Sequence, residues 1–84
     1  MTTKILLLTN NQILITGIEE VGADIGEPDC KLIEPFIVNQ SSLELSPWLI
    51  DMSVQNTFMI SSDKILTIAD PTENLIQKYN SLIK

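Results

Sequence analysis

The run Ile5-Leu6-Leu7-Leu8 constrains the fold more than any other segment of this sequence, because an aliphatic side chain occupies every position. Successive side chains of a β-strand point to opposite faces of its sheet, so both faces of this run are apolar. A strand of that kind is not a half-solvated edge. The segment must therefore lie inside the molecule or against a neighbouring copy.

The small size of the chain limits how much apolar surface it can cover. Apolar residues fill 44% of 84 positions, and 13 Ile and 11 Leu make up most of them. Area scaling at this length gives a folded surface of roughly 5,000 Å² against about 13,600 Å² for the unfolded chain, which is enough for one thin core. The sequence therefore predicts a single domain over residues 1–84 and a subunit interface that covers the remaining apolar surface.

The charge balance narrows the choice of partners. Five Lys, no Arg and eleven acidic residues give a net charge of −6. This charge argues against broad binding to nucleic acid or to anionic membranes. The first apolar run ends at Thr9-Asn10-Asn11 and is too short for a signal peptide or a membrane span, so we expect a cytoplasmic protein with no membrane partner.

Six short runs rich in β-branched and aromatic residues predict antiparallel strands separated by turn residues. They cover residues 4–9, 12–18, 30–38, 47–54, 57–60 and 64–69. Asn10-Asn11 predicts a tight hairpin with a type I′ turn, and Pro35 predicts an edge position or a bulge in the third strand. This close spacing is typical of a small, strongly bent barrel of five or six strands.

A C-terminal helix has the clearest local signal. Asp70 is a good N-cap, Pro71 suits the first helical position, and Glu73 follows the cap by three residues, which predicts a helix over 71–84. The apolar residues of this segment share one helical face. They are Leu75, Ile76, Tyr79, Leu82 and Ile83. The expected fold class is therefore mainly β with one C-terminal α-helix.

Few residues suggest catalysis or metal binding. The sequence has no His, and Cys30 is its one Cys, which excludes an internal disulfide and a His/Cys metal cluster. Cys30 also lacks a His to generate its thiolate, so a buried thiol is the favoured interpretation. We expect no catalytic residue, no metal and no cofactor, and therefore a protein that is not an enzyme.

Two further features each allow two interpretations. Residues 19–34 hold six acids against one Lys, which suits either a Ca²⁺ site or a solvated loop; the EF-hand spacing is missing, and the loop is favoured. Trp48 suits either base stacking or packing in a core or interface. Packing is favoured, because Trp48 is one of only four aromatic residues.

The order of these elements resembles the Sm and Sm-like proteins. Residues 60–68, Ile-Ser-Ser-Asp-Lys-Ile-Leu-Thr-Ile, look like the second Sm motif, and residues 4–38 would supply the first. Residues 32–38, 46–49 and 65–73 together are similar to Sm-like proteins of cyanophage and marine-metagenome origin. The resemblance implies a five-stranded antiparallel Sm-like barrel, in the host cytoplasm if the chain is phage-encoded.

The same resemblance implies a function. Sm-like proteins form rings of five to seven identical subunits, here with a pentamer favoured, in which the fourth strand of one subunit pairs with the fifth strand of the next. They act as RNA-binding modules of the RNA-chaperone type. The residues implied for single-stranded RNA here are Asn39, Ser61, Ser62 and Lys64, which the barrel would bring together at one face of the ring. Asn39 stands for the Asp and Asn that end the first motif, Ser61 and Ser62 stand where RNA-binding members carry Arg-Gly or Lys-His, and Lys64 is the neighbouring cation.

A competing interpretation keeps the ring and removes the RNA. The charge of −6 and the absence of Arg favour a structural or protein-interaction ring that does not bind nucleic acid. In that case the acidic loop or the helix would face a protein partner.

Overall fold

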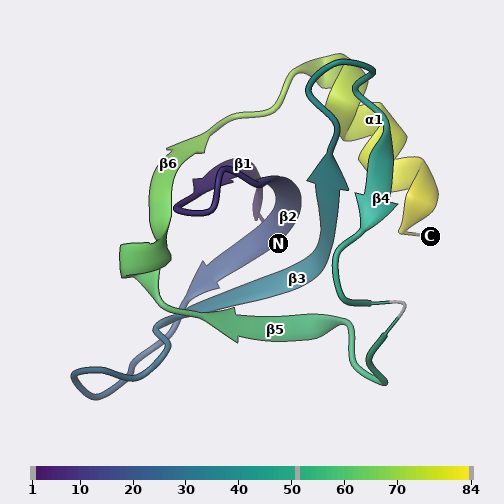
Figure 1. Cartoon of the computed structure of the whole chain (residues 1–84). Coiled ribbons are helices and arrows are strands. Elements are labelled where there is room, and N and C mark those ends of the chain that lie inside the picture. Colours follow the sequence, from purple (N-terminus) through teal and green to yellow (C-terminus); the bar gives the residue numbers. More distant parts are fainter. Residues whose placement is uncertain (1, 51, 84) are drawn as a thin grey trace.

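The architecture was obtained from a computed structural model that describes residues 2–50 and 52–83. It contains six strands, a 3-10 turn and one helix (Figure 1). In chain order these are β1 (Thr2–Leu8), β2 (Ile13–Glu20), β3 (Cys30–Val38), β4 (Leu45–Pro47), β5 (Thr57–Ile60), η1 (Ser62–Lys64), β6 (Ile65–Ala69) and α1 (Glu73–Leu82). The mainly β fold with one C-terminal helix is therefore confirmed.

All strand pairs are antiparallel, and the main path of the sheet runs β4-β3-β2-β1-β6. β5 also pairs with β3, so β3 carries β2 along one edge and both β4 and β5 along the other. The three residues of η1 lead from β5 at one side of the sheet to β6 at the other, and the sheet curls so that the end of β5 lies near the start of β6 (Figure 1).

The sheet is nevertheless open, and the expectation of a five-stranded closed barrel is wrong. β5 enters η1 and β6 leaves it in different directions, and no backbone pairing joins the two strands within residues 2–50 and 52–83. A predicted strand over residues 47–54 is also wrong. The fourth strand, β4, lies earlier, and residues 48–50 and 52–56 form turns and bends instead of a strand.

Both faces of β1 are covered, as its sequence predicts. Leu6 and Leu8 lie inside the curl of the sheet, in a cluster that includes Leu14 and Leu32. Ile5 faces the opposite side, where a second cluster lies between the sheet and α1. β1 also pairs with β2 and, from Ile5 to Leu8, with β6, so its aliphatic run has no free edge.

The first hairpin is present, but its turn differs from the predicted type I′. Only Asn11 has a positive φ, of 68°, whereas a type I′ turn requires positive φ at both central residues. The Asn11 N–H donates to the Leu8 carbonyl at 3.0 Å, and the Leu8 N–H donates to the Gln12 carbonyl at 2.9 Å. The hairpin therefore closes with one left-handed residue.

β3 contains the bulge that Pro35 predicts. Ile33 pairs with Gly17 and Phe36 pairs with Ile15, so two residues of β3 stand opposite one residue of β2. The first of the two, Glu34, has a φ of 53°. Few residues other than Gly adopt this left-handed conformation readily, so the bulge needs support from its surroundings.

The helix begins two residues later than its sequence predicts. Thr72 is the N-cap, with its hydroxyl accepting the Leu75 N–H at 3.3 Å, and the helix runs from Glu73 to Leu82. Asp70 is not the cap, because its carboxylate pairs with the Lys4 ammonium of β1. The helix packs on its own sheet through Leu75 and the fully buried Tyr79.

Candidate functional site

The structure brings three of the four predicted RNA-binding residues together. Ser61, Ser62 and Lys64 lie in or beside η1, between β5 and β6. Asn39 follows the opposite end of β3, where its side-chain oxygen accepts the N–H groups of Ser41 and Ser42. The four residues therefore do not form one loop cluster.

The partner of η1 is Asp29, which the sequence did not single out. One Asp29 oxygen accepts the Ser62 N–H at 2.7 Å, and the other accepts the Ser62 hydroxyl at 2.8 Å. These two hydrogen bonds stabilise the ionised form and hold the pKa of Asp29 below its ordinary value. The sequence places Asp29 directly before β3 but does not show that Cys30, the first residue of β3, pairs with Ile60, the last residue of β5. That pairing brings Asp29 next to η1.

The surroundings of this contact are acidic. A hollow of about 230 Å³ beside it is lined by residues 26, 27, 29, 61, 62 and 63, which include the carboxylates Glu27, Asp29 and Asp63. The Ser62 N–H and hydroxyl are the kind of donors that hold a phosphate, and here a carboxylate of the same chain already occupies them. This arrangement disfavours an anionic ligand at Ser62.

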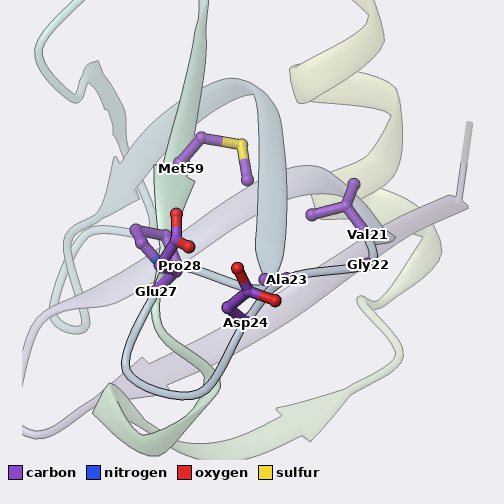
Figure 2. A pocket seen from close by; sticks show the side chains of 7 residues that line it. All are labelled: Val21, Gly22, Ala23, Asp24, Glu27, Pro28 and Met59. Atoms are coloured by element: carbon purple, nitrogen blue, oxygen red, sulfur yellow. The ribbon is translucent and has the colours of Figure 1, made fainter.

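The acidic loop spans residues 21–29 and is shorter than the predicted 19–34, because Glu19 and Glu20 belong to β2 and residues 30–34 belong to β3. A second hollow, of about 530 Å³, lies between this loop and β5. Figure 2 shows the Met59 side chain on one side of this hollow and the carboxylates of Asp24 and Glu27 on the other, with Val21 at one end. Met59 is 49% exposed although it belongs to a strand. The hollow therefore combines an apolar wall with two negative charges.

A third and larger hollow, of about 700 Å³, runs along β6. Four consecutive β6 residues, 65–68, line it, which places the hollow beside the backbone edge of this strand as well as its face. Ile18 and Cys30 line it from the facing strands. This groove is the gap through which the open sheet exposes part of its interior.

Cys30 is not prepared for nucleophilic chemistry. Burial is the main cause that raises the pKa of its thiol, and the nearby Asp29 and Glu20 carboxylates raise this pKa further. A raised pKa keeps the thiol protonated, whereas a nucleophile requires the thiolate. No group of three possible metal-binding side chains occurs among the described residues, so the acidic loop gathers no such set there.

Trp48 packs rather than standing free. Its ring lies edge-to-face with Phe58 at 6.0 Å, and its indole N–H donates to the Gln12 side chain at 3.2 Å. It contacts the cluster inside the curl of the sheet. This environment agrees with the packing interpretation of Trp48.

Exposed apolar side chains lie on both strands that border the opening of the sheet. They are Met59 on β5 and, on β6, Leu66 and Ile68, which are 61% and 53% exposed. Within the described part of the chain, β5 pairs only with β3 and β6 only with β1, so each strand presents an unpaired edge. No helix in the same residues is long and apolar enough to cross a bilayer.

The fold and these surfaces define a small, mainly β protein with a curled antiparallel sheet, two unpaired apolar edges and a helix over one face. The chain belongs to the family of unknown function DUF6561, whose model matches residues 1–84. No curated protein matches the sequence.

Proposed function

We propose that this protein is a self-assembling, Sm-like interaction module, in which the β5 edge of one copy pairs with the β6 edge of the next. The observation that carries the proposal is the pair of unpaired edges with exposed Met59, Leu66 and Ile68. Exposed apolar edges bind other strands readily, and soluble proteins normally cover or blunt them. Repeated pairing of two different edges around an axis gives a closed ring.

The element order supports the Sm-like assignment. A strand, a three-residue turn and a strand take the chain from one side of the curled sheet to the other, as the second Sm motif does. The expected assembly is a ring of five to seven identical copies, with a pentamer favoured. The ring would also cover apolar surface that the single chain leaves exposed.

Of the two interpretations, the site favours the ring that does not bind nucleic acid. Asp29 occupies the donors of Ser62, and Glu27 and Asp63 lie beside them, with Lys64 as the neighbouring cation. Phosphate binding needs positive charge and free donors. We therefore assign the module to structural or protein-interaction work, with single-stranded RNA as the competing ligand.

Assembly is tested by native mass spectrometry and light scattering of the full chain at micromolar concentration. Ile68→Lys places a charge on the β6 edge and should shift the population toward monomer. Leu82→Lys is a matched control, because Leu82 is 51% exposed and lies on α1, away from both edges. A wild-type protein that stays monomeric at tens of micromolar would contradict the proposal.

The nucleic-acid question needs a separate measurement. Fluorescence anisotropy with U-rich and A-rich oligomers at two salt concentrations should show no saturable binding at tens of micromolar subunit. Binding in low salt that Lys64→Ala abolishes would establish the RNA interpretation instead. A Lys78→Ala variant controls for the general loss of one positive charge.

A further inference from the structure

The acidic hollow beside β5 contains two carboxylates that pair with no cation in the described part of the chain. Asp24 and Glu27 line it, and neither carboxylate forms an ion pair within residues 2–50 and 52–83. The exposed Met59 side chain on the unpaired strand β5 forms the opposite wall. A complementary group would therefore be a cation carried on an apolar stem, which describes a Lys side chain.

Among the lysines that the structure describes, Lys64 is the cation without a partner. Lys4 pairs with Asp70, Lys31 lies 3.6 Å from Glu19, and the Lys78 ammonium donates to a loop carbonyl at 3.4 Å. Lys64 is exposed and, among the described residues, its ammonium has neither an ion pair nor a hydrogen bond. It stands directly before β6, which is the second unpaired strand.

We infer that Lys64 of an adjacent copy enters the hollow beside Met59 and lies between Asp24 and Glu27, an inference that rests on the edge-to-edge assembly proposed above. Its aliphatic stem would contact Met59 and Val21, and its ammonium would reach the two carboxylates. The acidic loop is then part of the subunit interface. This gives Asp24 and Glu27 a partner on the same kind of chain.

The charges also select the direction of strand pairing. In an antiparallel arrangement, the end of β5 at Ile60, next to the acidic hollow, meets the start of β6 of the next copy, which carries Lys64. In a parallel arrangement, the far end of β6 would meet the hollow and bring Asp70 toward the acids. Like charges brought together disfavour the wrong arrangement.

The test is a charge-reversal experiment on the full chain. Lys64→Glu and the double variant Asp24→Lys/Glu27→Lys are compared with wild type by sedimentation velocity at low and high salt. Lys78→Glu is the matched control, because it also changes the net charge from −6 to −8 but lies on α1. Circular dichroism checks that each variant is folded.

Lys64→Glu should raise the apparent dissociation constant of the assembly about tenfold at low salt and less at high salt, while Lys78→Glu changes it little. Combining Lys64→Glu, Asp24→Lys and Glu27→Lys in one chain should restore assembly, because every contact around the ring then joins opposite charges again. Failure of that triple variant to assemble, or unchanged assembly of Lys64→Glu, would overturn the inference while leaving edge pairing intact. Assembly driven by added CaCl₂ regardless of residue 64 would assign the hollow to a metal ion instead.

A monomeric wild type would show that the proposed assembly itself is wrong, and the role of Lys64 would fall with it. The two failures are distinguishable, because the first leaves wild-type oligomers in place and the second does not.

Discussion

Replacing Tyr79 with Phe removes one hydroxyl that holds the β3 bulge to α1. This hydroxyl accepts the Gly17 N–H at 3.2 Å and shares its proton between the carbonyls of Ile33 and Glu34, at 3.0 and 2.9 Å. Tyr79 is fully buried, so water cannot replace these partners. The bulge contains Glu34 in a left-handed conformation, and the hydroxyl is the side-chain group that bonds both carbonyls there.

The expected loss follows from these contacts. Each hydrogen bond contributes about 1 kcal/mol, and a buried N–H left without a partner costs about 1 to 3 kcal/mol, so Tyr79→Phe should lower the free energy of unfolding by about 2 to 3 kcal/mol. For a domain of this size the melting temperature should fall by about 10 to 20 °C. The ring remains and keeps its edge-to-face contact with Phe36 at 5.9 Å, so no cavity term is added.

Urea unfolding followed by Trp48 fluorescence measures this loss, at one fixed protein concentration because assembly would stabilise the folded state. Ser81→Ala is the control, since it removes an exposed hydroxyl from the same helix and should change the free energy by less than about 0.5 kcal/mol. If Tyr79→Phe unfolds within that same margin of wild type, the hydroxyl does not support the bulge.

The same variant makes a pH prediction. Burial raises the pKa of Tyr79 above its ordinary value of 10.0. As the pH rises above 10.0, the unfolded state loses the phenolic proton before the folded state does. The stability that comes from the neutral hydroxyl is therefore fully present below pH 10.0 and declines as the pH rises through the pKa of the folded state. Wild type should therefore lose more stability than Tyr79→Phe at alkaline pH, and equal losses would contradict this reasoning.

Three further predictions concern other parts of the chain. Ser62→Ala should raise the pKa of Asp29 toward its ordinary 3.8, as measured by carboxyl NMR, because the Ser62 hydroxyl stabilises the ionised carboxylate. In wild type this stabilisation is lost as the pH falls through the lowered pKa of Asp29. An unchanged pKa would show that Asp29 and the Ser62 hydroxyl are not in contact. At pH 8, Cys30 should react with a disulfide reagent about tenfold or more slowly than free cysteine, and reach the free rate in urea; fast reaction of the folded protein would show an accessible thiolate. Thr72→Ala should lower the free energy of unfolding by about 1 kcal/mol, more than Asp70→Ala does, and the reverse order in urea titrations would return the cap to Asp70.

Much of the strand layout is predictable from local pattern. β3 and β5 have the bounds that the sequence predicts, because turn residues flank both runs and β-branched and aromatic residues fill them. The coverage of both faces of β1 follows from its unbroken aliphatic run. Pro35 likewise predicts the bulge, since it cannot donate to a sheet ladder.

Other features depend on contacts that local pattern does not contain. Asp70 and Thr72 are both acceptable N-caps, and the choice between them is made by Lys4, which lies far away in sequence and pairs with Asp70. The position of the fourth strand is not predictable from the sequence, because β4 spans only three residues, too few to show an alternation of apolar and polar side chains. Whether the sheet closes depends on the angle at which β5 and β6 leave η1.

The candidate site was only partly predictable for the same reason. Ser61, Ser62 and Lys64 are adjacent in sequence, so any turn keeps them together. Asp29 lies 33 residues before Ser62 and meets it only through the pairing of β3 with β5. Asn39 lies at the Val38 end of β3 and η1 lies near the Cys30 end, and no local signal shows which loops the curl of the sheet brings together.

The pairing of β1 with β6 has a consequence for the newly made chain. β1 is synthesised before the other strands, but its partner residues in β6 lie within 65–69, and α1 follows later still. On the ribosome the β1–β2 hairpin therefore waits with an open edge and an uncovered Ile5 face until β6 and α1 have emerged. Such a segment is prone to aggregate while it waits. Slow translation should thus harm the yield of this protein, and a chaperone that covers the first twenty residues should protect it.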